Sequence, residues 1–458
     1  MPNQAYRFDV FDRLDHPRVF VVGILLFALL NLAIYWLADS SCYKIDEDCA
    51  KQHDIYSFPT AKNILDHGSI VDPTKPDQPS TYRQFPPLSG AVMALALWPL
   101  GGSDLQLLVL LQALMLLATA TLVRSCLSHL SIGLANLAFL AVIFNPNLLV
   151  GVHVPQTESL FALFMTAGFA VAWGSGKDIT LRRAAVFGCL FGLATLVRPS
   201  NQFLFLVLPF VFPLVAFVRG KAGIWRRPFL ASIAAMTVAL ATISPWLAFQ
   251  VNAGVGLRLS GPGLEALFIL NNLKFLTKEM PGEGNGVWRG RFETEQHDRL
   301  VAENPGYEHM PRLRRDELWL ADTRKYFAAV PFDVRTFAIA MAKSTIRFFI
   351  SGGEGEIHSL FGMEYQPEIS PIAFYGIKAF AIAYALMSRL LGMFGAFYLL
   401  TRGDRGLLVL AVGLVAYFWL AHFVHGKPRF RAVVEPQLAI FAAFGVAQLF
   451  VKRRVQAS

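Results

Sequence analysis

A series of long apolar runs, almost free of charged side chains, limits what this chain can fold into more than any other feature. The first run, residues 19–38, has twenty residues and no charge, which is enough to cross the hydrocarbon core of a bilayer as a helix. The pattern gives ten candidate spans: 19–38, 105–123, 131–152, 159–174, 184–197, 199–218, 228–249, 372–400, 406–424 and 436–451. Because backbone amides inside a bilayer must be hydrogen-bonded within the protein, the sequence predicts that these runs are α-helices.

The composition agrees with a membrane protein and argues against soluble classes. Of the 458 residues, 55% are hydrophobic and only 16% are charged, and the mean hydropathy is +0.46. These values exclude disordered, coiled-coil and collagen-like chains. The first run is long for a signal peptide, and Asp9, Asp12 and Asp15 precede it, so we expect a true span. The net charge of +9 would indicate a nucleic-acid partner only if the basic side chains shared one surface.

Two segments decide how the spans alternate across the membrane. Residues 85–100 are apolar but short and contain three prolines, which predicts a re-entrant or interfacial segment. Residues 184–218 contain Arg198 directly before Pro199, so we expect two spans that turn at Arg198. With the N-terminus in the cytoplasm, the cytoplasmic segments then hold 16 basic side chains and five acidic ones, as the positive-inside rule requires.

This topology predicts an all-α polytopic membrane protein with about ten transmembrane helices and both termini in the cytoplasm. It divides the chain into an N-terminal membrane module (1–249, with a first outer loop at 39–103), a large outer loop (250–371) and C-terminal spans (372–458). The outer loops are slightly acidic, so no nucleic-acid partner is expected. Interfacial helices are expected in both outer loops. In the large loop they are 316–329 and 336–350, and the second carries Lys343 and Arg347 at the membrane surface.

Common motifs of nucleotide and metal chemistry are absent from the sequence. It has no P-loop, no GxGxxG after a strand, no HExxH and no CxxC. Nucleotide-driven transport therefore has no support, and any chemistry is expected from side chains at the outer face. In the first outer loop, Cys42 and Cys49 are close enough to form a disulfide in an oxidising compartment, with two free thiols as the alternative.

His53, Asp54 and Tyr56 begin a predicted amphipathic helix in the first outer loop. Two interpretations of Asp54 are open. It caps the helix N-terminus, or, at the membrane rim, it accepts a proton from an acceptor hydroxyl. The acidic residues at 46–48 form a rival cluster for the second role, with a solvated loop as the simpler explanation.

Two further outer segments carry polar candidates. Tyr82 and Arg83 lead into the re-entrant segment, where Arg83 either anchors to lipid headgroups or binds a phosphate. His153 and Glu158 lie in the short loop before the span at 159–174, where a glutamate either marks the interface or takes part in a site. A charge between two apolar spans is costly, so Arg198 is a functional candidate whose partner is Glu158 or a lipid phosphate.

The most concentrated cationic segment of the outer face runs from His425 to Arg431. Arginine presents a planar fork that suits phosphate oxygens, so Arg429 and Arg431 are predicted to bind a phosphate. Glu435 lies four residues after Arg431, and an ion pair between these two side chains is the alternative.

Together these motifs resemble the GT-C superfamily of membrane glycosyltransferases, which includes protein O-mannosyltransferases and lipid A aminoarabinose transferases. The matching motifs, in chain order, are Asp54 with Tyr56 and Ala61, Tyr-Arg-x-x-Pro-Pro at 82–87, Leu-Val-Arg-Pro at 196–199, and Pro-Arg-Phe-Arg at 428–431 followed by Glu435 and Pro436. The first motif departs from the family pattern, which often has two acids where His53 precedes Asp54 and Ile55 follows it.

The resemblance implies transfer of a sugar, with inversion, from a polyprenyl-phosphate donor of the undecaprenyl-phosphate type to an acceptor at the outer face of a bacterial inner membrane. The implied base is Asp54, and Glu158 would orient the acceptor or assist a divalent metal, the one cofactor that the resemblance allows. The implied ligands of the donor phosphate are Arg83, Arg198, Arg429 and Arg431, and the further site candidates are His53, Tyr56, Tyr82, His153, His425 and Glu435.

Two other functions share the apolar spans. A transporter or flippase of lipid-linked saccharides predicts polar residues along a path through both leaflets, whereas the candidates here gather at the outer face. A non-catalytic scaffold predicts that conservative changes at Asp54 leave function intact. The sequence therefore favours the enzyme, with membrane lipids and a lipid-linked sugar as its partners.

Overall fold

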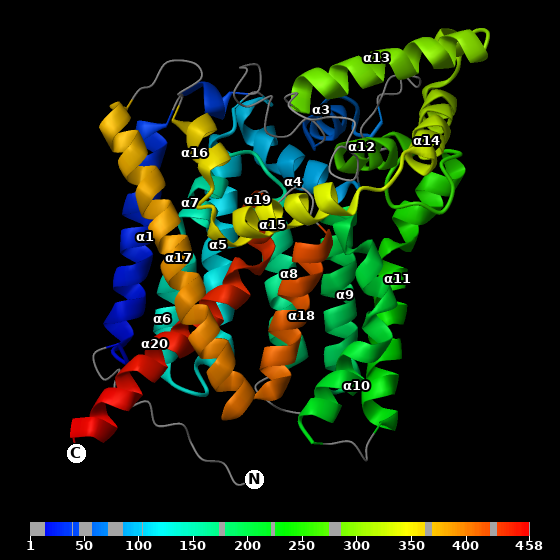
Figure 1. Ribbon diagram of the computed structural model, residues 1–458. Helices are drawn as coiled ribbons and strands as arrows, with labels where there is room; N and C mark the ends of the chain where they lie inside the picture. Colours follow the sequence, from blue (N-terminus) through cyan, green and yellow to red (C-terminus); the bar gives the residue numbers. More distant parts are fainter. Residues whose placement is uncertain are drawn as a thin grey trace.

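A computed structural model describes residues 14–38, 40–44, 57–71, 86–102, 104–173, 179–220, 225–273, 285–361, 369–421 and 428–457. These residues form helices and contain no β-strand, and the one isolated bridge joins Lys44 and Asp104. The prediction of an all-α polytopic membrane protein is confirmed (Figure 1).

Each of the ten apolar runs is helical over most of its described residues. They form α1 Pro17–Leu37, α5 Gln106–Leu127, α6 Ile132–Ile143 with α7 Pro146–Val152, α8 Glu158–Trp173, α9 Leu181–Val197, η6 Pro199–Leu206 with α10 Leu208–Val218, α11 Arg226–Asn252, α17 Pro371–Thr401, α18 Arg405–Ala421 and α20 Glu435–Ala457. Among the described residues, five helices are long and apolar enough to cross a bilayer, or up to seven if the two bent pairs each count as one span. The pairs bend by 54° at α6–α7 and by 59° at η6–α10.

The loops contribute shorter helices. They are η2 Ser40–Tyr43, α3 Ser57–His67, α4 Leu88–Leu97, η4 Trp98–Leu100, α12 Pro262–Leu273, α13 Asn285–Glu303, η7 Tyr307–His309, α14 Arg312–Ala329, α15 Val334–Ile350, α16 Glu354–Leu360, α19 Pro428–Arg431 and η8 Ala432–Val434. The helices expected at 316–329 and 336–350 are present as α14 and α15. The ten-residue α4 is about 15 Å long, too short to cross a bilayer, which agrees with the prediction for 85–100.

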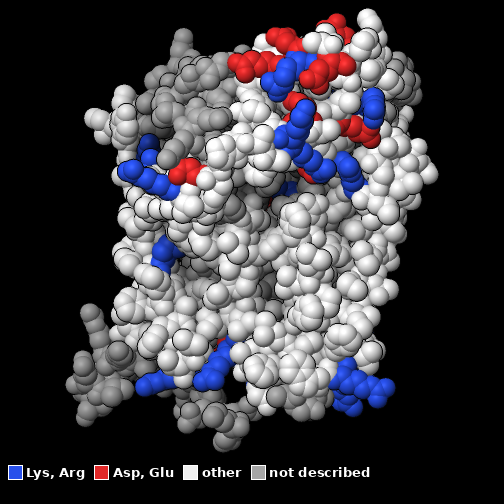
Figure 2. Space-filling view, turned by 45° about the vertical axis from the view of Figure 1, so that its right-hand side comes forward, with Lys and Arg blue, Asp and Glu red and all other residues white. Residues whose placement is uncertain are grey.

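The two ends of the molecule differ. In Figure 1, α1 begins and α20 ends at the bottom, while α12, α13 and α14 lie at the top and α15 runs across the molecule beneath them. On the face shown in Figure 2, the charged side chains gather towards the two ends, and the band between them is almost uncharged. A bilayer would occupy that band. We call the end with α12–α14 the upper end and the opposite one the lower end.

Glycines allow the helices around the site to pack backbone to backbone. A Cβ atom placed on Gly395 of α17 would lie 1.9 Å from the carbonyl oxygen of Phe441 in α20, and one placed on Gly445 would lie 1.9 Å from the carbonyl oxygen of Leu391. Small residues permit this close approach of membrane helices. The α17–α20 crossing also brings Arg389 of α17 to Glu435, the first residue of α20.

Asp404, between α17 and α18, ties helices together at the lower end. Its carboxylate accepts hydrogen bonds from Arg219 Nη2 at 2.9 Å and from Trp173 Nε1 at 2.8 Å, so it joins α8, α10 and α18. Burial alone would raise the pKa of Asp404, but the hydrogen bonds from Arg219 and Trp173 outweigh it and lower that pKa below its usual value.

Candidate functional site

Arg198 and Glu158 meet where two membrane helices end and begin. Glu158 is the first residue of α8. Arg198 follows α9 with extended backbone angles, because Pro199 disfavours the helical conformation in the residue before it. Arg198 Nη1 donates to Glu158 Oε1 at 2.6 Å, and the two side chains are only 12% and 9% exposed. Of the two partners expected for Arg198, the structure shows Glu158.

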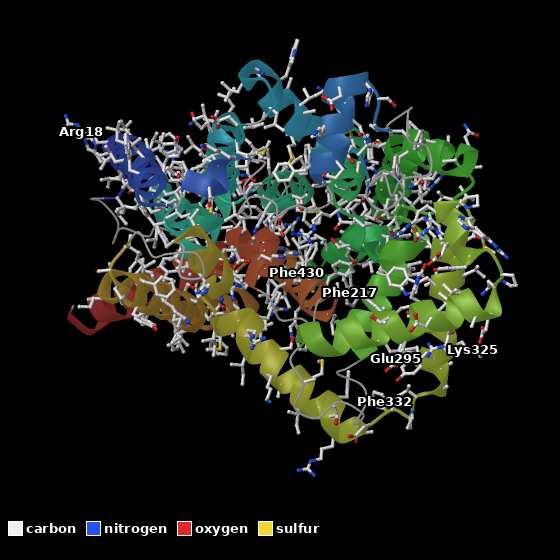
Figure 3. The ribbon with its side chains drawn as sticks, turned by 90° about the horizontal axis from the view of Figure 1, so that it is seen from above. Arg18, Phe217, Glu295, Lys325, Phe332 and Phe430 are labelled. Atoms are coloured by element: carbon white, nitrogen blue, oxygen red, sulfur yellow. The ribbon has the colours of Figure 1, made fainter. Side chains whose placement is uncertain are left out.

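Arg429 approaches the same carboxylate from the other half of the chain. Its Nε lies 3.9 Å from Glu158 Oε1. The ring of Phe430, near the middle of the molecule in Figure 3, lies beneath both guanidinium groups, 5.3 Å from Arg198 and 5.1 Å from Arg429, within the range of cation–π attraction. Glu158, Arg198, Arg429 and Phe430 are called the Glu158 cluster below. It contains two cations and one carboxylate, so it carries a net positive charge.

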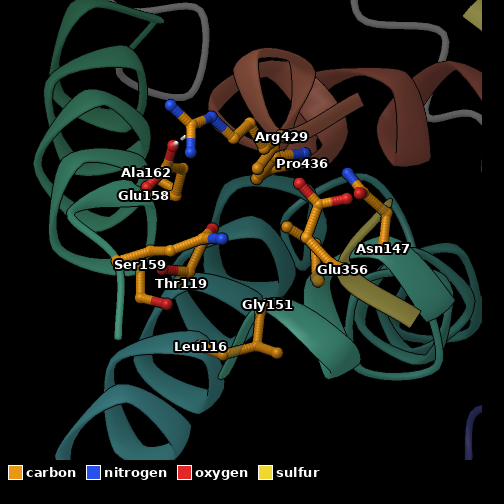
Figure 4. Close-up of a pocket in the computed structure, with 13 residues that line it drawn as sticks. Leu116, Thr119, Asn147, Gly151, Glu158, Ser159, Ala162, Glu356, Arg429 and Pro436 are labelled. Atoms are coloured by element: carbon orange, nitrogen blue, oxygen red, sulfur yellow. Dashed lines mark ion pairs between the residues drawn. The ribbon is translucent and has the colours of Figure 1, made fainter. Parts of the chain in front are cut away.

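A small pocket with a cavity volume of about 20 Å³ lies beside this cluster. It lies between α5, α7, α8, α16 and the α19–α20 segment, and Figure 4 shows Glu158 and Arg429 on one side and Glu356 on another. The lining residues are Leu116, Thr119, Asn147, Leu148, Gly151, Gln156, Glu158, Ser159, Ala162, Glu356, Arg429, Ala432 and Pro436. Within the part of the chain that the structure describes, Gln156 Nε2 and Arg429 Nε are buried and make no hydrogen bond. The pocket therefore offers unused donors to a ligand.

Glu356 is the pocket carboxylate that the sequence analysis missed. It lies on α16 and is 9% exposed. Nothing in the sequence near 354–360 connects this segment with the last span, so its place in the pocket depends on the tertiary fold.

A second cluster gathers around Glu435, which is 1% exposed. Its Oε1 accepts hydrogen bonds from Arg431 Nε and from Arg389 Nη2, the latter at 2.6 Å, and its Oε2 accepts one from Asn145 Nδ2 at 2.9 Å. These four residues are called the Glu435 cluster. It also gives a partner to Arg389, a charged residue within the long apolar helix α17.

Arg431 is held by protein groups. It is 1% exposed, and its other two nitrogens donate to the carbonyl oxygens of Phe348 and of Ser351, the latter at 2.7 Å. The ion pair with Glu435, stated above as the alternative to phosphate binding, is therefore present. A phosphate at Arg431 would have to displace buried protein acceptors, so we do not assign Arg431 to the donor.

His153 joins three segments of the upper end. Its Nδ1 and Nε2 each lie 3.1 Å from a polar partner, the hydroxyl of Tyr43 and Oδ1 of Asn31 respectively. The side chain is buried, and burial lowers the pKa of His153 to about 4. These contacts indicate a neutral histidine that connects α1, η2 and the end of α7.

Several predicted site residues lie outside the described residues: His53, Asp54, Tyr56, Tyr82, Arg83 and His425, as do the acids at 46–48. The same holds for Cys49, while Cys42 is disulfide-bonded and Cys126 and Cys189 are free. Among the described residues, no group of three or more His, Cys, Asp or Glu side chains is placed to hold a metal ion.

The comparisons with known proteins give a likeness of fold. No protein-family model and no curated protein matches the chain. It is similar to the crystal structure of the apo oligosaccharyltransferase of Archaeoglobus fulgidus, with a TM-score of 0.53 and 14% identity over 96% of this chain and 51% of that one. The same enzyme tethered through a disulfide bond to an acceptor peptide with the NVT sequon gives a TM-score of 0.50 and 13% identity over 95% and 50% of the two chains.

A further similar structure is that of ArnT from Cupriavidus metallidurans bound to undecaprenyl phosphate. Its TM-score is 0.40, with 14% identity over 93% of this chain and 78% of that one. The chain spans about half the length of the archaeal structures that it matches. It has the fold that the archaeal oligosaccharyltransferase shows over that half, and the GT-C-like fold expected from the sequence motifs is thereby confirmed.

Proposed function

We propose that this chain is an integral-membrane glycosyltransferase. It moves a sugar, with inversion, from a polyprenyl-phosphate donor of the undecaprenyl-phosphate type to an acceptor at the outer, periplasmic face of a bacterial inner membrane. The observation that carries the proposal is the Glu158 cluster, where two arginines share one carboxylate beside a small pocket. The fold supports it, since the similar archaeal structures are of an oligosaccharyltransferase.

The proposed reaction needs few protein groups. The acceptor hydroxyl attacks the anomeric carbon of the sugar and gives its proton to Asp54, while the bond from that carbon to the phosphate oxygen breaks. Because the leaving group is a phosphate, no general acid is needed, and cations that hold its charge suffice. We assign this role to Arg198 and Arg429, with Arg83 as a further candidate, and we assign orientation of the acceptor to Glu158.

The decisive experiment measures donor consumption by the purified protein in lipid nanodiscs. Undecaprenyl-phosphate-linked sugars are supplied together with a bacterial envelope extract as the source of acceptor hydroxyls, and release of undecaprenyl phosphate is followed for the parent, Asp54→Asn and Asp404→Asn. We expect Asp54→Asn to lose about 100-fold or more in rate, as for removal of a general base. Asp404→Asn, a matched change at the lower end, should keep turnover. Full activity of Asp54→Asn would contradict the base assignment, and no turnover of any donor by the parent would contradict the enzyme.

The proposed orientation has its own test. In a background without Cys126 and Cys189, a cysteine replaces either Arg405, an exposed residue at the lower end, or Arg314, an exposed residue of α14. An impermeant thiol reagent applied from the periplasmic side should label the cysteine at 314 and spare the one at 405. The reverse pattern would overturn the topology.

A further inference from the structure

We infer that Glu435 is a positioning residue for the donor-phosphate site: it fixes the short helix α19 so that Arg429 faces Glu158 and the pocket. The inference rests on the proposed function in one respect, because it takes Arg429 as a ligand of the phosphate. It goes beyond that function because it explains the direction of the Arg429 side chain by contacts in a second, buried cluster.

The Glu435 carboxylate collects donors from three separate parts of the chain. Arg389 belongs to α17, Arg431 to α19, and Asn145 lies between α6 and α7. Both carboxylate oxygens are engaged, and the group is 1% exposed. A charge buried to this degree is stable only while its partners stay in place, so the carboxylate and its donors restrain one another.

Arg431 extends this restraint to α15. Its terminal nitrogens donate to the carbonyl oxygens of Phe348, in the last turn of α15, and of Ser351, which follows that helix. The last carbonyls of a helix lack partners within it, and a basic side chain satisfies them. The small helix α19 is thus held between the end of α15 and the start of α20.

Helix geometry then sets the direction of Arg429. Successive residues of an α-helix are turned by about 100°, so side chains two positions apart point to nearly opposite sides. In the four-residue α19, Arg431 turns towards Glu435 while Arg429 turns towards Glu158 of α8. A helix of four residues has few internal hydrogen bonds, so its orientation depends on side-chain contacts such as that of Arg431.

The first test is a double-mutant cycle on the affinity for undecaprenyl phosphate in nanodiscs. We expect Glu435→Gln to weaken binding by about 10-fold, because a displaced Arg429 would lose one charge-assisted hydrogen bond to the phosphate. In an Arg429→Ala background, the same change should alter binding by less than about twofold, because the group that it positions is absent. An equal loss in both backgrounds would overturn the inference. Asp404→Asn, which breaks a comparable pair at the lower end, is the control and should change binding by less than about twofold.

A second measurement does not depend on the ligand. A spin label is attached to a cysteine at position 429 in a background without Cys126 and Cys189, and its mobility is recorded in nanodiscs. Glu435→Gln should increase that mobility, and Asp404→Asn should leave it unchanged. Unchanged mobility in Glu435→Gln would overturn the positioning role even if the protein binds the lipid. A parent that binds no undecaprenyl phosphate would instead contradict the proposed function, and the mobility result would still stand.

A milder variant covers the case in which Glu435→Gln fails to fold. Arg431→Lys keeps the positive charge beside Glu435 but loses the planar fork that reaches the two carbonyls of α15. It should produce the same two effects in smaller measure. If Arg431→Lys keeps the parental affinity for undecaprenyl phosphate and the parental mobility of the spin label, Arg431 does not help to position Arg429.

Discussion

The Glu158 and Glu435 clusters are built from the same parts and differ in how completely their polar atoms are used. Each places one glutamate between two arginines from different segments of the chain. Around Glu435, each nitrogen of Arg389 and of Arg431 donates to a protein oxygen. Around Glu158, the side chain of Arg429 is 32% exposed, borders the pocket, and has an Nε without a hydrogen bond among the described residues.

We interpret this difference as one between a structural cluster and the proposed binding cluster. A buried polar atom without a partner costs free energy, so a fold that needs only stability satisfies its buried charges, as the Glu435 cluster does. A site that must accept a charged ligand keeps donors available until the ligand arrives. The two clusters meet in α19, where Arg429 serves one and Arg431 serves the other.

The largest expected effect is on stability. Glu435→Gln leaves two buried arginines without their anion, and we expect it to lower the free energy of unfolding by about 3–5 kcal/mol. Thermal unfolding in nanodiscs, followed by tryptophan fluorescence, measures the change. The matched variant is Glu158→Gln, whose partner Arg429 is partly exposed and which should cost less. An equal loss in both variants would remove the distinction between the clusters.

The next effect concerns the donor. Arg429→Ala should weaken the binding of undecaprenyl phosphate by about 10- to 100-fold, as for loss of a hydrogen bond to a charged group, with a loss of stability below about 1 kcal/mol. Isothermal titration calorimetry in detergent measures the affinity, and thermal unfolding measures the stability. Arg431→Ala should instead lower the stability more than it lowers the affinity for undecaprenyl phosphate. Unchanged affinity in Arg429→Ala would remove this arginine from the phosphate site.

Features that depend on residues close together in the sequence could be predicted from it. Charge-free runs identified the helices, and Pro199 marked the turn at Arg198. The spacing of four residues allowed the pair of Arg431 with Glu435, which was the alternative to the predicted phosphate binding. These features depend on neighbours along the chain, where helix geometry leaves little choice.

Contacts between segments far apart in the sequence could not be predicted in this way. Arg389 lies 46 residues before Glu435, and the two meet because glycines let α17 and α20 cross closely. The sequence predicts phosphate binding for both Arg429 and Arg431, and the contacts of Arg431 with Glu435 and with the carbonyls at the end of α15 show that this arginine is occupied. Glu356 enters the pocket from a segment without any motif.

His153 offers a third comparison. It is buried like the two glutamates, but it is uncharged and therefore needs no partner of opposite charge. Its pKa, near 4 in the folded protein, lies below the value of about 6.5 in an unfolded chain. Between these values the unfolded state binds more protons, so stability falls as the pH drops from 6.5 towards 4, by at most about 1.4 kcal/mol for each pH unit. His153→Gln should flatten the pH dependence of the unfolding temperature in this window. A slope that persists in His153→Gln would assign the titration to another group.

The smallest effect asks whether Glu158 competes with the phosphate or holds the arginines for it. In the first case, Glu158→Gln frees Arg198 and Arg429, and the affinity for undecaprenyl phosphate should rise by about 2- to 5-fold, as expected for loss of the competing, partly exposed ion pair with Arg429. Glu265→Gln, which removes a carboxylate paired with Arg258 and Arg324 in the upper end, is the control and should leave affinity unchanged. If Glu158→Gln binds the lipid more weakly than the parent, Glu158 positions Arg429 just as Glu435 positions α19. The two clusters would then form one continuous support for Arg429, and both glutamates would act on the donor phosphate through that arginine.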